Sequence, residues 1–413
     1  MSITQSQAQE LAQYYSHMTG ETLFSTVGIE GKEGDRTTYV AKVSFADLAA
    51  HFNLVPTNDA PAGVMLQREL ATSRKKGIAN YIKNNCDFVF PELIAVVGEL
   101  DIQATSISSI VTINLAKTSF RYLVDGQGRL FGIKDALSND PSLADQTVDV
   151  KFIISRGVAS DAQIFTDINK TPTSPNASQC IAMDTRQVLS KFAKEAVLAN
   201  ASLTQRVDFS KASVTGKADS ETIWTLNQFS KFIQILTGTT ARSAEKMFDD
   251  SAQRAHWIGF INKFMTELQR NPFFADAINH GAGQSTKDSI VATSVFLKSL
   301  ALFGKVILMN FAVSDNDEAD WSFMDTFATI DLSTSNKEWV GRCLNYRGRF
   351  EDKSFNHQAV ASFLSNTTGL DVPEELETVE EEVLMARASI LKQQREEAKA
   401  KASNQNEALD LAS

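Results

Sequence analysis

The sequence predicts an α+β protein, with a mixed α/β domain followed by a mainly helical domain and an acidic tail. Three observations predict this class. Strand-like and helix-like segments alternate up to about residue 175, helical periodicity dominates from there to about residue 311, and the chain becomes strongly acidic from residue 371. We therefore expect the domains to span residues 1–175, 176–370 and 371–413.

The first domain opens with strand signals. Thr22–Val27 and Thr37–Val43 are rich in β-forming residues, and the turn-like GIEGKEGDR between them predicts a hairpin. Ser44 is placed to cap a short helix, SFADLAAHF, and RELATSRKKGIANYIKN has helical periodicity. LIAVVG, after Pro91, predicts a buried strand, and SIVTINLA and FRYLV predict two more. The domain is completed by the segment DGQGR, a helix LFGIKDAL, a strand VDVKFIIS and a helix DAQIFTDIN.

The second domain begins after KTPTSPNASQ, whose Pro, Ser and Thr content indicates a linker or surface loop. Strong helical periodicity is found in three segments: ETIWTLNQFSKFIQIL, SAEKMFDDSAQRAHWIGFINKFMTELQR and residues 290–313. The last run approaches the ~20 residues that cross a bilayer. However, Lys298 and Lys305 lie inside it, and each would cost about 3 kcal/mol near the bilayer centre. We therefore expect a buried core helix and no membrane partner.

Composition narrows the classes of function. A chain of 413 residues exceeds one compact core, and 43% apolar with 22% charged residues is ordinary for a globular protein. The net charge is −10, so any nucleic-acid contact must come from a local patch. Residues 371–413 hold eleven acids and five bases, which leaves only −4 for the rest of the chain. The acidic tail begins with a helical pattern, and from its charge we consider two roles for it, self-association and the screening of nonspecific DNA.

Cysteine and histidine usage gives no sign of a metal centre. The three cysteines, Cys86, Cys180 and Cys343, are far apart and form neither a disulfide framework nor a zinc pair. The five histidines show no metal-ligand spacing. The N-terminus lacks a signal-peptide pattern. We expect a cytoplasmic protein with no metal and no catalytic residue that the sequence identifies.

The segment FRYLVDGQGRLFGIKDAL is the most informative one. A strand delivers the chain to Asp125, Gly126 permits a tight turn, and Gly128 lets the backbone approach a ligand. Arg129 falls in the first turn of the following helix, beside free amides and the positive end of the helix dipole. Asp125, Gly126, Gln127, Gly128 and Arg129 are therefore a candidate phosphate- or nucleotide-binding turn.

A purely structural interpretation fits the same pattern. Asp125 would then cap the helix, and Arg129 would pair with an acid. If the turn binds an anion instead, we expect Arg129→Ala to abolish that function with little loss of fold.

VDGQGRLFGI resembles the signature of the DGQHR-domain family, whose best-known members are the DndB proteins of DNA phosphorothioation systems. Three further segments are similar to the family in the same order: LQRELATSRKKGIANYIKNNCDFVFPELIAVV, IFTDINKTP, and IDLSTSNKEWVGRCLNYRGRF near the C-terminus. The matches cover about residues 65–180 and 325–385. The helical middle carries no such motif.

The resemblance implies an N-terminal domain like that of ParB and sulfiredoxin, in which the equivalent turn grips nucleotide phosphates. It also implies DNA binding and repression of DNA sulfur-modification genes. One position departs from the family, because the histidine of DGQHR is Gly128 here. An imidazole role is lost while a backbone cradle with Arg129 remains, which favours binding over catalysis. Sulfiredoxin-like chemistry is disfavoured because no cysteine adjoins the turn.

Two basic groups are candidate DNA contacts. Arg68, Arg74, Lys75 and Lys76 lie on one predicted helix and suit phosphate contacts, although a solvated helix face would look the same. Arg342, Arg347 and Arg349 alternate with Trp339, Tyr346 and Phe350 near the C-terminus. Arginines beside aromatic rings suit phosphates and base stacking, although a tryptophan core with surface arginines is the alternative.

Three functions follow from these features. The first is a DNA-binding repressor of a phosphorothioate modification or defence operon, acting on double-stranded DNA as a homo-oligomer. The second is a slow nucleoside triphosphatase switch that binds ATP or CTP with Mg²⁺ at Asp125–Arg129. The third is an adaptor that binds other DNA-modification proteins. The sequence does not identify a required cofactor.

Overall fold

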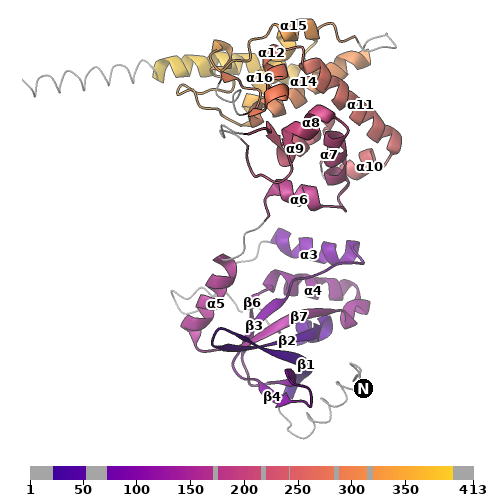
Figure 1. Cartoon of the computed structure of the whole chain (residues 1–413), viewed down its shortest axis with the longest axis vertical. Coiled ribbons are helices and arrows are strands. Elements are labelled where there is room, and N and C mark those ends of the chain that lie inside the picture. Colours follow the sequence, from indigo (N-terminus) through magenta and orange to yellow (C-terminus); the bar gives the residue numbers. More distant parts are fainter. Residues whose placement is uncertain are drawn as a thin grey trace, which may run out of the picture. The chain divides into compact units, whose positions relative to one another are not determined.

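The computed structural model divides the chain into two compact units, Met1–Thr173 and Ser174–Ser413, each with its own hydrophobic core (Figure 1). It describes residues 22–52, 72–170, 175–214, 220–240, 242–282, 288–313 and 320–393. A mixed sheet followed by helices confirms the predicted α+β class.

The first unit is built on a seven-stranded sheet of order β4-β5-β1-β2-β7-β3-β6. All neighbouring strands are antiparallel except β3 and β7, which are parallel. The strands are β1 (Thr22–Glu33), β2 (Arg36–Ser44), β3 (Leu93–Val97), β4 (Asp101–Ala104), β5 (Ile110–Ala116), β6 (Arg121–Asp125) and β7 (Thr147–Ile154).

Helices cover the two faces of this sheet unequally. One face packs against α2 (Phe45–His51), α3 (Thr72–Asn84) and α4 (Gln127–Asn139), and this layer contains the main core of the unit. A short 3-10 helix, Pro141–Asp145, follows α4. On the other face, among the described residues, α5 (Val158–Lys170) covers β3 and β6, where Val96, Tyr122 and Val124 pack against Ile164 and Phe165.

Most predicted elements of the first unit are present, with shifted ends. The hairpin forms, but GIEGKEGDR is largely strand, with the turn at Gly34 and Asp35. Ser44 caps α2 as predicted, because its side chain accepts the Asp47 amide. The short edge strand β4 was not predicted, because its sequence DIQA is too polar to give a strand signal.

The second unit is almost entirely helical. Its helices are α6 (Ala177–Met183), α7 (Val188–Leu198), α8 (Ala201–Arg206), α9 (Leu226–Thr237), α10 (Ala244–Phe248), α11 (Ser251–Leu268), α12 (Pro272–His280), α14 (Ser294–Val313), α15 (Met324–Ala328), α16 (Ser354–Thr367) and α17 (Glu374–Glu377). Two-residue strands β8 (Val207–Asp208) and β9 (Trp224–Thr225) pair in parallel, and a 3-10 turn spans Lys337–Trp339. The segment SAEKMF…ELQR forms two helices because Asp250 caps α11.

The apolar run at residues 290–313 forms α14, which packs against α9 and α16. By length and composition Ser294–Ala312 could cross a membrane, but 56% of it is buried inside the protein. Lys298 donates from Nζ to both carboxylate oxygens of Asp352 at 2.8 Å. The interpretation as a core helix is therefore confirmed.

The acidic tail begins as part of the helical unit. After α17, residues 379–393 form a further helix, which we call the tail helix. Val379 and Val383 are buried against α16. Glu380 accepts two hydrogen bonds of 2.6 Å from the buried Arg342 guanidinium. Burial alone would raise the pKa of Glu380. The hydrogen bonds from Arg342 and its positive charge outweigh this effect, so the pKa lies below its ordinary value.

Glu380→Gln is expected to destabilise the helical unit by about 2 kcal/mol at neutral pH, because it removes one charge of a partly buried pair. The pKa of Glu380 is lower in the folded state than in the unfolded state, where it is 4.5. The ion pair therefore stabilises the folded protein fully above pH 4.5, and this stabilisation is lost as the pH falls through the folded-state pKa. Thermal unfolding of both proteins between pH 7 and pH 3 checks this, with exposed Glu382→Gln as control. A difference that stays constant with pH contradicts the role of the charge.

Candidate functional site

The DGQGR turn joins the edge strand β6 to α4. Gly126 has φ 100°, in the left-handed region, and is the N-terminal cap residue of α4. A Cβ atom there would lie 2.6 Å from Cγ of the buried Leu93, so both the backbone angle and the packing require glycine. The turn is therefore fixed by the sheet beneath it.

Arg129 is held by the protein's own acceptors. Its guanidinium donates to the carbonyl oxygens of Pro91 and Glu92 at 2.7 and 3.0 Å, and to Asp125 Oδ2 at 2.6 Å. The Arg129 side chain is only 13% exposed. The guanidinium thus connects the end of β6 to the segment that enters β3. This geometry matches the acid pairing of the structural alternative, although Asp125 pairs with Arg129 and does not cap the helix.

The amides of the first turn of α4 keep their donor capacity. The first backbone hydrogen bond of the helix runs from Leu130 N–H to Gly126 O, so the amides of Gln127, Gly128 and Arg129 precede it. No side chain among the described residues caps this end of α4. The Gln127 side chain instead donates to Leu123 O at 3.0 Å. An anion at this turn would meet backbone amides more readily than the Arg129 guanidinium.

The predicted basic helix packs directly on α4. A Cβ atom at Gly132 of α4 would lie 2.4 Å from Ile78 Cγ2, so the two helices approach closely through glycine. Arg74, Lys75 and Lys76 fall in the first half of α3, although their side chains lie outside the described part of the chain. Arg68 also lies outside the described residues. Their role as DNA contacts stays a prediction.

The C-terminal arginines differ in their environments. Arg342 is buried, donates to Ala359 O at 2.8 Å and lies over the Phe363 ring at 5.0 Å, in addition to its pair with Glu380. Its assignment to an exposed arginine cluster is therefore wrong. The acid that holds it lies 38 residues later in the sequence, so local spacing gave no sign of this pair.

Arg347 and Arg349 lie on a tight turn that we call the arginine turn, residues 345–350. The Asn345 side chain accepts the backbone amides of Arg347 and Arg349 at 2.9 and 3.1 Å. Gly348 adopts φ 69° and donates to Asn345 O at 2.9 Å. Both arginines are exposed, and the Arg347 guanidinium lies 4.9 Å from the centre of the Tyr346 ring. Asn345, which sequence reasoning missed, fixes the backbone that presents them.

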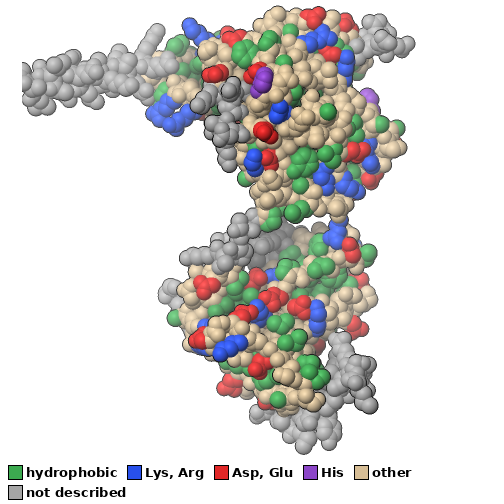
Figure 2. Space-filling view, in the orientation of Figure 1, with side chains coloured by type: hydrophobic (Ala, Val, Ile, Leu, Met, Phe, Trp, Pro, Cys, Tyr) green, Lys and Arg blue, Asp and Glu red, His purple; other side chains and the backbone are tan. Residues whose placement is uncertain are grey.

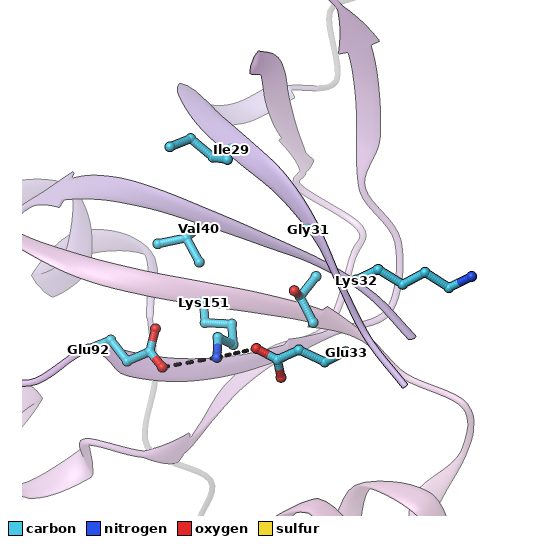
Figure 3. Close-up of a pocket in the computed structure, with 8 residues that line it drawn as sticks. Ile29, Gly31, Lys32, Glu33, Val40, Glu92 and Lys151 are labelled. Carbon is cyan, nitrogen blue, oxygen red and sulfur yellow. Dashed lines mark hydrogen bonds and ion pairs between the residues drawn. The ribbon is translucent and has the colours of Figure 1, made fainter. Parts of the chain in front are cut away.

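A shallow cavity of about 350 Å³ lies on the sheet face that α5 leaves open (Figure 3). Lys151 lies in it between Glu33 and Glu92, with Nζ–O distances of 2.7 and 3.0 Å. Burial alone would lower the pKa of Lys151, but its hydrogen bonds to the two carboxylates outweigh this and raise it. Two acids around one base disfavour an anionic ligand here. The carbonyl of Glu92 accepts from Arg129, so one residue joins this cavity to the DGQGR turn.

Charge is mixed on the face of the molecule that Figure 2 shows. In the view of Figure 2, lysine and arginine side chains alternate with aspartate and glutamate on each unit. Among the described residues, no group of three or more histidine, cysteine or acidic side chains is arranged to hold a metal. On the face that Figure 2 shows, basic side chains are thus interspersed with acidic ones.

These features describe a two-unit protein with a mixed sheet, a glycine-dependent strand-to-helix turn and exposed arginines on a helical unit. The chain belongs to the DndB family, described as DNA-sulfur modification-associated, whose family model matches residues 26–371. The protein is thus involved in DNA sulfur modification. No curated protein and no solved structure matched the chain. The likeness of the first unit to ParB and sulfiredoxin stays a prediction.

Because Arg129 connects two strands, we expect Arg129→Ala to lower the free energy of unfolding by about 2–3 kcal/mol. A residue whose only role is to contact a bound anion would have a small effect on the unfolding of the free protein. Denaturant unfolding of the full chain measures it. Arg156→Ala is the matched control, because Arg156 also pairs with an aspartate, Asp35, but both side chains are largely exposed. Equal, small effects in the two variants would contradict a structural role for Arg129.

Proposed function

We propose that this protein is a DNA-binding transcriptional repressor of a DNA phosphorothioate modification and defence operon. Its membership of a DNA-sulfur modification-associated family supports this placement. The observation that carries the proposal is the arginine turn, where two exposed arginines are presented by a backbone that Asn345 fixes. We propose double-stranded DNA as the partner, the cytoplasm as the compartment, and a homo-oligomer as the active form.

The arginine turn has the chemistry of a nucleic-acid contact. A guanidinium recognises phosphate oxygens through paired hydrogen bonds, and stacking on Tyr346 orients the Arg347 side chain. Phe350, at the end of the turn, is 37% exposed and offers an apolar edge to sugars or bases. Because the backbone of the turn is already ordered by its own hydrogen bonds, binding would order little beyond the arginine side chains.

The basic half of α3 is the second proposed contact. Arg74, Lys75 and Lys76 follow one another on a helix that rests on α4, and a run of three bases suits sequence-independent phosphate contacts. We assign Arg68 to the same contact on its place in the sequence alone. In this proposal, the basic residues of α3 would supply affinity through phosphate contacts, and a few other side chains would supply specificity for the DNA sequence.

Arg347→Ala with Arg349→Ala is expected to weaken binding to the DNA upstream of the protein's own gene, because two charge-assisted phosphate contacts are lost. If both arginines contact phosphates, the slope of log affinity against log salt becomes shallower by about 2. Fluorescence anisotropy with that duplex and with a scrambled one, at several salt concentrations, measures both quantities. Arg74→Ala with Lys75→Ala provides the same comparison for α3.

The matched control is Lys353→Ala, which removes an exposed positive charge just outside the arginine turn. It should leave the affinity nearly unchanged. Thermal unfolding should also be unchanged in the double variant, because both arginines are exposed. Wild-type affinity in the double variant would exclude the arginine turn as the contact, and failure of the wild type to bind any duplex at low salt would favour the adaptor function.

A second candidate function is nucleotide binding at the DGQGR turn, with ATP or CTP and Mg²⁺ and slow hydrolysis. The uncapped first turn of α4 favours it, since the amides of Gln127, Gly128 and Arg129 could meet phosphate oxygens. The occupied guanidinium of Arg129 counts against it.

Titration calorimetry with ATP and CTP in Mg²⁺, together with a phosphate-release assay, separates the two functions. We expect no turnover, because Asp125, the acid of the turn, is already paired with the Arg129 guanidinium. Asp125→Asn provides the control, since Asp125 is the one acid of the turn. Turnover in the wild type that disappears in Asp125→Asn would instead establish the hydrolase and contradict a binding-only turn.

A further inference from the structure

The tail helix has one apolar face in the body of the protein and another on its surface. Val379 and Val383 are buried, and Arg387 on the same side donates to the carbonyl oxygens of Val340 and Glu338 at 3.0 and 2.9 Å. Leu384, Met385 and Leu391 point elsewhere and are 64%, 71% and 55% exposed. The helix is therefore anchored through one side while three large apolar side chains remain in solvent.

The exposed residues form a stripe along the helix. Leu384, Ala388 and Leu391 are spaced by four and three residues, which places them on one line of an α-helix, and all three are exposed. Glu381 precedes them on the same line of the tail helix, and Glu377, the last residue of α17, lies four residues before Glu381. We call these five residues the outer stripe. Figure 1 shows the helix, in yellow, leaving the helical unit.

We propose that the outer stripe is a self-association surface, on which the tail helix of one copy pairs antiparallel with that of a second copy of this chain. The distribution of charge supports this occupant. The stripe begins with two acids, Glu377 and Glu381, and Lys392 adjoins its other end. The stripe is thus complementary to itself when reversed.

The direction of pairing follows from the same charges. In a parallel pair, Glu377 and Glu381 would face their own counterparts, which like charges disfavour. An antiparallel pair centred on Ala388 brings the acidic end of each helix to the basic end of the other. It also places Leu384 beside Leu391 of the second copy. Ala388, at the centre, is small enough for the two helices to approach closely.

This association is independent of the proposed DNA contacts, because the outer stripe contains neither the arginine turn nor α3. Its leucines, Leu384 and Leu391, are exposed, whereas the buried contacts of the tail helix are made by Val379 and Val383. A variant of the stripe should therefore leave the helical unit folded. This separation allows the oligomeric state to be tested without changing either of the other sites.

Sedimentation velocity of the full chain over a range of concentrations tests the proposal. The wild type should form a dimer, and Leu384→Glu with Leu391→Glu should raise the dimer dissociation constant at least about tenfold with unchanged thermal unfolding. Met183→Glu is the control, because Met183 is 75% exposed elsewhere in the same unit. A wild type that stays monomeric, or a double variant that dimerises as well as the wild type, would overturn the proposal.

Cysteine cross-linking tests the direction. In a background where the exposed Cys86 and Cys180 are replaced by serine, Ala388→Cys should form a disulfide-linked dimer under mild oxidation. Leu384→Cys alone and Leu391→Cys alone should cross-link far less, because in an antiparallel pair each position is remote from its own counterpart. Equal cross-linking at all three positions would indicate a parallel pair and would refute the antiparallel arrangement.

Discussion

The guanidinium of Arg129 is the contact on which the arrangement of the first unit depends. It joins the carboxylate that ends β6 to two carbonyls that precede β3, at the point where the chain turns into α4. Gly126 is required beneath it, because Leu93 fills the space that a side chain would take. Glu92 extends the connection through the sheet, since its carbonyl accepts from Arg129 and its carboxylate pairs with Lys151. The turn is thus rigid before any ligand arrives, whether or not it holds one.

Sequence patterns predicted the elements of the first unit because local rules determine them. The glycine-rich hairpin, the Ser44 cap and the apolar strand after Pro91 all depend on neighbours within a few residues. The contacts of Arg129 with residues 37 and 38 positions earlier could not be predicted in this way. Likewise, Lys151 between Glu33 and Glu92 depends on strand pairing across the sheet, which single-sequence periodicity does not give.

The C-terminal arginines also show that a local sequence pattern does not predict contacts with residues distant in the sequence. Arg342 and Arg347 are five residues apart in one motif, yet one is buried and the other exposed. The difference comes from Glu380, which lies in a segment that composition marks only as acidic. Part of the tail's negative charge therefore neutralises a buried base. The sequence did place Arg347 beside Tyr346, and these two side chains are in contact, whereas the turn that presents Arg347 depends on Asn345, which the sequence pattern did not single out.

The net negative charge places a physical constraint on any DNA complex of this protein. With a net charge of −10, the protein as a whole is repelled by a duplex at long range, so affinity must come from short-range contacts at a few ordered positions. One arginine turn offers too few such contacts for tight binding. Two copies joined through their tail helices would present two turns to one duplex, and the second contact would form at a high effective concentration. Dimerisation would then strengthen DNA binding by placing two arginine turns on one duplex, although the dimer contact and the DNA contact use separate residues.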